Sequence, residues 1–250
     1  MKSLGIDIGS RFIKAALMID GELVRSVRVE TSFDPLQRCR EIMADLPADR
    51  AIATGYGRHL LEIHGDIPTI TEIKAFARGA RACFPGCRTV VDIGGQDTKV
   101  ICMNDQGRVI KFEMNDRCAA GTGKFLEVMA RTLGFSMEEF AALSPNGGEV
   151  VKLSSMCTVF AESEVISLIA KGGDRADIAR AVQRSVANRV TSMVKRLPVE
   201  EDVVFAGGCA QNLCLRAMIK ESLGKGLEVA LTPEIVGALG AALYAAEDAG

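Results

Sequence analysis

The sequence has little of several residue types, and each shortage excludes a class of site or protein. Among 250 residues there is no tryptophan and there are only two histidines, which is too few for a histidine-based metal site. No stretch approaches the roughly 20 apolar residues of a membrane-spanning helix. Neither sign of charge dominates, since 30 basic residues stand against 32 acidic ones. A net charge of −2 gives no electrostatic basis for binding nucleic acid or an anionic membrane surface.

The remaining composition is that of a globular protein. Hydrophobic residues make up 48% and charged residues 25%, and the chain is long enough for two small lobes around a shared cleft. Asp7 comes before any signal-peptide core could form, so we expect a cytoplasmic protein. Cytoplasmic thiols stay reduced, and the eight cysteines therefore do not predict a disulfide framework.

A short motif occurs twice. Asp7-Ile8-Gly9-Ser10 is followed by Lys14, and Asp92-Ile93-Gly94-Gly95 is followed by Lys99, with an offset of 85 residues for both the aspartate and the lysine. Each copy predicts a buried strand, a tight glycine turn and a second strand that returns as a hairpin. The repeat predicts an α/β protein with two similar lobes.

Two such turns that face one cleft would bind the phosphates of a nucleotide and its Mg²⁺. Glycine has no Cβ, so an anion can approach the backbone, while Ser10 adds a hydroxyl group and Lys14 a positive charge. A further glycine pair follows the predicted strand Val203–Ala206, where adenosine could lie against the backbone. The candidate nucleotide-binding residues are Gly9, Ser10, Lys14, Gly94, Gly95, Gly121, Thr122, Gly123, Gly207 and Gly208.

Four residues are candidates for the chemistry of phosphoryl transfer. Asp7 and Asp92 are free to hold Mg²⁺, and Gln96 and Asp97 are candidates for orienting an attacking water molecule.

The lobe boundary is predicted from a break in helical pattern. Glu72–Cys83 is alanine-rich with helical spacing and is closed by Pro85-Gly86. We therefore predict lobes at 1–87 and 88–250, and we allow for the C-terminal helix to pack back on the first lobe.

Two cysteines precede predicted helices. Cys118 comes before a predicted helix at Lys124–Leu133, and Cys157 before one at Val165–Lys171. A helix N-terminus favours thiolate over thiol, and two thiolates are half the ligand set of an iron–sulfur cubane, which a two-fold homodimer would complete. From spacing alone, two buried and unreactive cysteines remain the favoured interpretation.

With these motifs the sequence resembles a known family, the ATP-hydrolysing activators of 2-hydroxyacyl-CoA dehydratases. These are related to the ATPase subunits of benzoyl-CoA reductase and have the actin, Hsp70 and sugar-kinase fold. The resemblance covers nearly the whole chain, and the segments around Cys118 and Cys157 are its most specific part. The matching segments are Leu4–Ser10, Thr54–Arg58, Asp92–Asp97, Asn115–Gly123, Cys157–Ile166, Gly207-Gly208 and Gly237–Ala242.

The resemblance implies a two-lobed actin-like ATPase with ribonuclease H-like duplicated lobes and a nucleotide cleft between them. It implies a homodimer that shares one oxygen-sensitive [4Fe-4S] cluster, ligated by Cys118 and Cys157 of each subunit, with ATP/ADP and Mg²⁺ as further cofactors. The implied activity is ATP-driven transfer of a low-potential electron to a dehydratase or reductase component, with a ferredoxin or flavodoxin as the electron donor.

The chain also departs from this family. Relatives often have Ser-Thr in the first phosphate turn, whereas here Ser10 is followed by Arg11; many have Cys-His where this chain has Lys74-Ala75. Two other classes remain open, a small-molecule kinase of the same fold without a cluster and a nucleotide-dependent scaffold protein.

Overall fold

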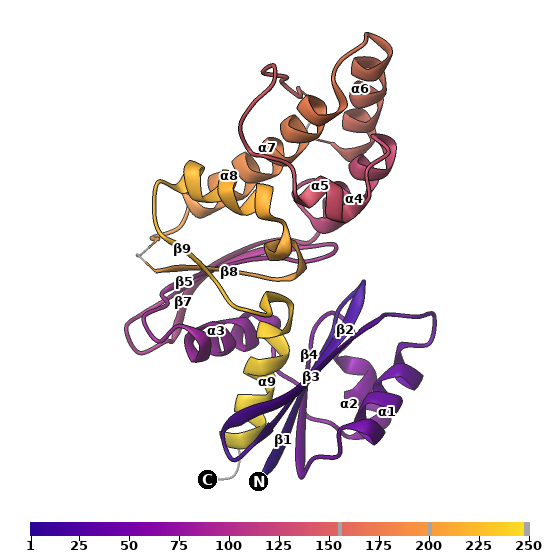
Figure 1. The fold of residues 1–250 in the computed structure, drawn as a ribbon. Coiled ribbons are helices and arrows are strands. Elements are labelled where there is room, and N and C mark those ends of the chain that lie inside the picture. The colour runs from indigo at the N-terminus through magenta and orange to yellow at the C-terminus, as the bar shows by residue number, and fades with distance from the viewer. Residues whose placement is uncertain (155–156, 200–201, 248–250) are drawn as a thin grey trace.

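The computed structural model describes residues 1–154, 157–199 and 202–247, which form two sheets and the helices around them (Figure 1). The first sheet has the strand order β3-β2-β1-β4. Its strands are β1 (Lys2–Ile8), β2 (Phe12–Ile19), β3 (Glu22–Glu30) and β4 (Arg50–Thr54). The first three are antiparallel neighbours, and β4 runs parallel to β1.

The second sheet repeats this topology with one further strand. Its order is β7-β6-β5-β8-β9. The strands are β5 (Thr89–Ile93), β6 (Thr98–Met103), β7 (Val109–Asn115), β8 (Val203–Ala206) and β9 (Leu227–Val229). Again the first three are antiparallel, and β8 pairs in parallel with β5 as β4 does with β1. The duplication predicted from the repeated motif is confirmed.

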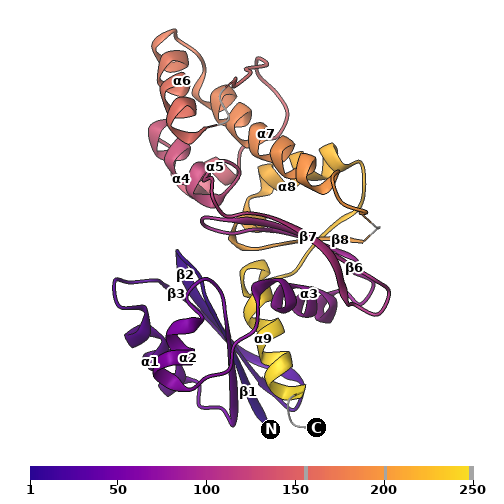
Figure 2. The same cartoon turned by 180° about the vertical axis from the view of Figure 1, so that it is seen from behind.

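The helices cover both faces of each sheet (Figures 1 and 2). They are α1 (Pro35–Asp45), α2 (His59–Gly65), α3 (Glu72–Cys83), α4 (Gly123–Thr132), α5 (Met137–Ala141), α6 (Thr158–Ala170), α7 (Arg175–Val194), α8 (Leu213–Leu223) and α9 (Val236–Glu247). On the first sheet, α1 and α2 pack on one face and α9 on the other. On the second, α3 packs on one face, and α7 and α8 on the other.

The middle layer therefore consists of α3 and α9, which lie side by side between the two sheets in both views (Figures 1 and 2). Glycines let their backbones approach closely. A Cβ at Gly79 of α3 would lie 2.0 Å from the carbonyl oxygen of Val236, and one at Gly240 of α9 would lie 1.8 Å from that of Ala75. We call the first sheet with α1, α2 and α9 the first lobe, and the second sheet with α3 to α8 the second lobe. A division of the sequence at residues 87 and 88 stays a prediction.

The hydrophobic pattern of the sequence explains most of these elements. A stripe of β-branched residues spaced four apart in the sequence is buried on α7, where Ile178, Val182 and Val190 are fully enclosed. The predicted helix Glu72–Cys83 is confirmed as α3, and the hydroxyl of Thr71 caps it by accepting from the backbone N–H of Lys74. Within the described ranges, no helix combines the length and the apolar character that crossing a membrane requires.

Candidate active site

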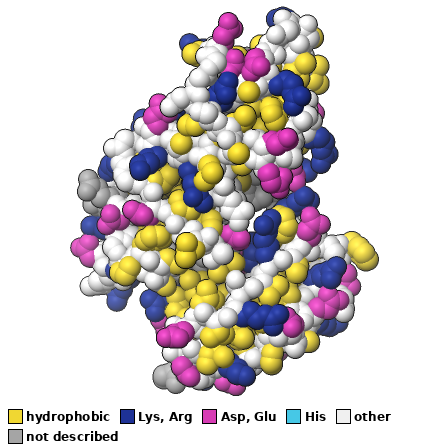
Figure 3. All heavy atoms as spheres, viewed as in Figure 1, with side chains coloured by type: hydrophobic (Ala, Val, Ile, Leu, Met, Phe, Trp, Pro, Cys, Tyr) yellow, Lys and Arg dark blue, Asp and Glu magenta, His cyan; other side chains and the backbone are white. Residues whose placement is uncertain are grey.

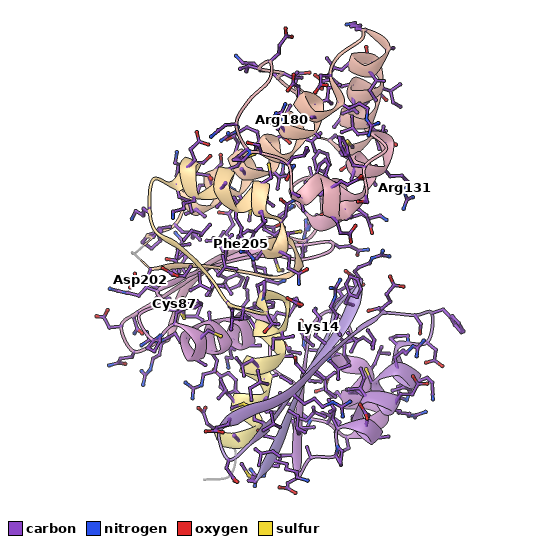
Figure 4. All side chains as sticks on the ribbon, viewed as in Figure 1. Lys14, Cys87, Arg131, Arg180, Asp202 and Phe205 are labelled. Carbon is purple, nitrogen blue, oxygen red and sulfur yellow. The ribbon has the colours of Figure 1, made fainter. Side chains whose placement is uncertain are left out.

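The repeated motif builds the same structure at the end of each sheet. Asp7 on β1 stands opposite Lys14 on β2, and Asp92 on β5 opposite Lys99 on β6. Lys14 Nζ is 2.7 Å from Asp7 Oδ2, and Lys99 Nζ is 3.1 Å from Asp92 Oδ2. Figure 4 labels Lys14 at the end of the first sheet that faces the second lobe. Each lobe therefore presents a buried aspartate–lysine pair towards the other.

The turn after each aspartate is also the same. The N–H of Gly9 donates to the carbonyl of Phe12 at 3.1 Å, and the N–H of Gly94 donates to that of Asp97 at 2.9 Å. Gly94 has no room for a side chain, because its Cβ would lie 2.3 Å from Asp97 Oδ1. In the first turn, a Cβ at Gly9 would lie 2.8 Å from the carbonyl oxygen of Phe12, so both turns are too tight for a side chain at this position.

Each aspartate keeps one oxygen without a protein partner. Oδ1 of Asp7 and Oδ1 of Asp92 are buried and have no hydrogen-bond partner among the described residues. Glycines pack around both, since a Cβ at Gly55 would lie 2.6 Å from Asp7 Oδ1 and one at Gly207 would lie 2.2 Å from Asp92 Oδ1. A buried acceptor without a partner is costly, and a metal ion or its water ligands would satisfy both atoms. The two aspartates thus fit Mg²⁺, which binds one or two carboxylates and keeps several waters.

Lys99 is the centre of a charge network that the sequence did not reveal. It is 1% exposed, and its Nζ lies 2.5 Å from Asp97, 3.1 Å from Asp92 and 3.6 Å from Glu72. Burial alone lowers the pKa of Lys99, but the three carboxylates outweigh it and raise that pKa, so Lys99 stays charged. Asp97, a candidate for orienting water, is therefore held by a fixed cation.

Glu72, on the first turn of α3, is the residue that sequence reasoning missed. Burial raises its pKa to about 7, and Lys99 only partly offsets this rise. Burial likewise raises the pKa of Asp92 to about 6. A signal existed in the sequence, because Glu72 is the first residue of a helix that Thr71 caps. Only the fold shows that this helix begins beside Lys99, at the buried base of the site, which we call the floor.

The floor carries more negative than positive charge. Four carboxylates share it with two ammonium groups; these residues are Asp7, Glu72, Asp92, Asp97, Lys14 and Lys99. A divalent cation would balance this excess, and its charge would also lower the pKa values that burial raises.

The turns of the two lobes meet. A Cβ at Gly95 would lie 3.0 Å from the Cβ of Arg11 and 3.6 Å from Ser10 Oγ. Arg11 then crosses to the second lobe, where its Nη2 lies 2.7 Å from Glu127 on α4. Gln96 is exposed at the tip of the second turn. The two predicted phosphate turns are thus brought together, with Ser10 and Gln96 accessible at their edges.

The Gly121-Thr122-Gly123 segment lies directly behind the second turn. The N–H of Gly123 donates to the carbonyl of Gly94 at 2.9 Å, and the N–H of Lys124 to that of Gly95 at 2.8 Å. The hydroxyl of Thr122 is buried and donates to the carbonyl of Ala119 at 2.6 Å. This segment therefore anchors the N-terminus of α4 to the turn.

The last glycine pair follows β8. Gly207 has φ of +83°, a conformation that favours glycine, and it packs over Asp92. Gly208 is exposed and has open space where a side chain would stand. The pair therefore leaves the backbone accessible beside the second aspartate.

The two candidate metal ligands lie in different settings of the second lobe. Cys118 is half-buried in the loop after β7, where Asn115 Nδ2 donates to its carbonyl at 2.9 Å. Cys157 is exposed at the N-cap of α6. Both thiols are free, and the described residues of one chain contain no group of three or more side chains that could hold a metal ion. One chain therefore offers at most part of a ligand set.

Two helix boundaries differ from those predicted. The helix after Cys157 begins at Thr158 and not at Val165, because the polar residues Glu162 and Ser163 occupy helical positions without breaking the backbone pattern. Cys118 precedes α4 by five residues, and Thr122 is the N-cap residue, so only Cys157 lies at a helix N-terminus.

The chain is similar to proteins of known activity over its whole length. The model of the BadF/BadG/BcrA/BcrD ATPase family matches residues 4–245. The (R)-2-hydroxyglutaryl-CoA dehydratase activating ATPase of Acidaminococcus fermentans is 42% identical over 97% of this chain and 96% of its own.

Solved structures agree with this assignment. The activator of the 2-hydroxyisocaproyl-CoA dehydratase from Clostridium difficile, with bound ADPNP, superposes with a TM-score of 0.91 at 38% identity, over 99% of this chain and 95% of that one. A ROK family glucokinase from Streptomyces griseus, 14% identical with a TM-score of 0.63 over 99% of this chain and all of its own, shares the fold alone. The predicted two-lobed actin-like architecture is confirmed, and the chain belongs to the BadF/BadG/BcrA/BcrD ATPase family.

Proposed function

We propose that this ATPase is an electron-transfer activator. Two copies of the chain would share one [4Fe-4S] cluster through Cys118 and Cys157, and ATP hydrolysis would drive a low-potential electron into a 2-hydroxyacyl-CoA dehydratase or a related reductase component. A ferredoxin or flavodoxin would then reduce the cluster again with a new electron. The similar proteins from Acidaminococcus fermentans and Clostridium difficile are named as dehydratase activators, which supports a partner of that kind.

The cleft supplies what nucleotide hydrolysis needs. Asp7 and Asp92 each offer an unpaired buried oxygen to Mg²⁺, and the glycine turns leave backbone exposed towards a phosphate chain. Lys14 stands beside Asp7 as a charge for the phosphates. We assign Gln96 and Asp97 to the orientation of the attacking water, with Glu72 as a further carboxylate at the same floor.

The cysteines fit the cluster by their number and accessibility. A cubane takes four thiolates, one chain has two candidates, and a two-fold axis would bring together the four from two chains. Cys157 is exposed and Cys118 half-buried, so both can reach a neighbouring subunit, whereas Cys39, Cys87, Cys102 and Cys214 are buried in the cores. When bound, such a cluster stores and releases one electron at low potential.

One observation carries the proposal: two backbone hydrogen bonds and a short stretch of chain join the nucleotide turn to a cysteine. The first backbone N–H groups of α4 are bonded to Gly94 and Gly95, and the same segment leads back within a few residues to Cys118. α6, whose N-cap residue is Cys157, packs against α4, and the hydroxyl of Thr132 donates to Glu162 across that contact at 3.2 Å. A nucleotide that shifts the second turn would therefore shift the supports of both cysteines.

The test is the iron content of protein purified without oxygen. We expect about four irons and four sulfides per dimer, with an electron paramagnetic resonance signal of a reduced cubane after treatment with dithionite. Cys118→Ala should lose the iron while it keeps its affinity for ADP, because the cysteine lies outside the phosphate turns.

Cys83→Ala is the matched control, since Cys83 is also free and half-buried but lies at the end of α3. It should retain the iron. Equal iron in the Cys118 variant and the control, or no iron in anaerobically reconstituted wild type with intact ATPase activity, would contradict the proposal.

A further inference from the structure

A second cavity lies away from the nucleotide cleft. It has a volume of about 440 Å³ and is bounded by α3, the C-terminal part of α9 and the turn between β6 and β7. Small-molecule sites commonly occupy roughly 300 to 1,000 Å³. Its charged and aromatic lining residues are Lys74, Arg78, Arg81, Arg108, Tyr244 and Glu247. Figure 3 shows the face on which α3 and α9 lie, with Lys and Arg side chains beside exposed hydrophobic ones.

The lining is strongly basic, with four cations and one carboxylate. Glu247 pairs with Arg78. Within the described part of the chain, no carboxylate pairs with Lys74, Arg81 or Arg108, and Arg81 donates only to the carbonyl of Asn104, at 3.4 Å. Three cationic groups therefore face one cavity without a neutralising partner.

The arginines of α3 are also held in place. Arg81 packs on Gly107 of the turn, where a Cβ would lie 2.6 Å from Arg81 Cδ. Arg78 has a buried Nε that finds no hydrogen-bond acceptor among the described residues. Preorganised guanidinium groups lose little freedom when they bind such an anion.

We propose that this cavity is a binding site for a small phosphorylated molecule, distinct from the nucleotide cleft. A phosphate group offers several oxygens and two negative charges, which matches several convergent cations, whereas a single carboxylate would satisfy only one of them. The ring of Tyr244 and the side chains of Ala77 and Val109 provide an apolar wall for the organic part of the ligand.

The test is calorimetric titration of full-length protein whose cleft is already filled with Mg²⁺ and ADPNP. Ribose 5-phosphate and inorganic phosphate are the probes, and ribose is the uncharged control. We expect the phosphorylated probes to bind in the millimolar range or tighter and ribose not to bind. The double variant Lys74→Ala/Arg108→Ala should weaken binding by about tenfold or more, because hydrogen bonds to charged groups contribute at least that factor.

Both residues of that variant are exposed, so it should fold normally. The matched control is Arg40→Ala/Lys220→Ala, which removes one exposed arginine and one exposed lysine elsewhere and should bind as wild type does. The proposal is overturned if neither phosphorylated probe binds, or if binding is the same in the cavity variant and the control.

Discussion

Glu72 is a carboxyl group whose chemistry is set by burial. It lies on the first turn of α3, 3.6 Å from Lys99, and burial raises its pKa from the usual 4.5 to about 7. The folded protein therefore binds more protons at this group than the unfolded chain does. By linkage, the stability associated with Glu72 is fully present below pH 4.5 and is lost as the pH rises through 7.

We expect the free energy of unfolding of the nucleotide-free and magnesium-free protein to fall between pH 5 and pH 8, by up to about 3 kcal/mol for this group. Glu72→Gln removes the ionisation and should flatten that part of the profile. Urea unfolding at a series of pH values measures both. Asp92, whose pKa is raised to about 6, should keep a slope at lower pH in the variant.

Glu228→Gln serves as the control, because Glu228 is exposed on β9. Its profile should match wild type. A Glu72→Gln profile that still falls as steeply as wild type between pH 6 and pH 8 would show that Glu72 ionises normally in the folded protein.

At the scale of elements, the crossing of α3 and α9 depends on two glycines. Gly79 and Gly240 bring the helix backbones so close that a Cβ on either would meet a carbonyl oxygen of the other helix at 2.0 Å or less. Backbone atoms cannot move aside as a flexible side chain can, so the helices themselves would have to separate.

Gly79→Ala should therefore destabilise the protein by about 1 to 3 kcal/mol, even though alanine favours a helix. The measurement is the midpoint of urea unfolding. Gly226→Ala is the control, because nothing lies within 4 Å of the added Cβ. Equal midpoints for the two variants would mean that the crossing relaxes without cost.

A helix was predicted correctly from the sequence where the spacing of its residues was clear. The alanine-rich helix α3 was foreseen from its spacing and from the Pro85-Gly86 pair that follows it. The start of α6 was missed because its hydrophobic side chains do not gather on one face; Val159 and Phe160 are both exposed. Helical spacing of apolar residues indicates a buried helix face, so this pattern does not identify a helix whose apolar side chains are exposed.

At the scale of the whole molecule, an ion pair joins the first phosphate turn to the second lobe. Arg11 leaves the first phosphate turn and reaches Glu127 on α4, with an N–O distance of 2.7 Å. Glu127 also contacts Lys124 at 3.2 Å. An exposed pair contributes little to folding, but a pair between two lobes also acts on the equilibrium between open and closed clefts.

Arg11→Ala should speed the dissociation of ADP by about 2- to 5-fold, which corresponds to the upper range for an exposed ion pair. Stopped-flow displacement of a fluorescent ADP analogue gives this rate. The difference from wild type should shrink in high salt, because salt screens the pair.

Arg25→Ala is the matched control. Arg25 is as exposed as Arg11 and pairs with Asp45 at 2.8 Å, but both residues of this pair belong to the first lobe. ADP should leave this variant at the wild-type rate. If both variants release ADP equally fast, the Arg11 pair does not restrain the cleft.

The sequence sufficed for the duplication and for the residues of the turns, because the Asp-x-Gly motif and its lysine recur at one offset and each copy builds the same hairpin. The sequence could not predict that Glu72 belongs to the site, because Glu72 lies beside Lys99 only as a result of the direction in which α3 runs. Nor could spacing show that Arg11 meets Glu127, since that contact depends on how two separately folded sheets face each other.

The position of α9 also has a consequence for how the protein is made. The strands of the first sheet leave the ribosome long before residues 236–247, yet those residues cover one face of that sheet, and Gly5 lies against the backbone of Ala238. Until those residues emerge, Ala16 and Met18 lack their packing partners. The first lobe can therefore complete its packing only after the entire second lobe has been synthesised. A chaperone that binds nascent chains is most useful to this protein in that interval.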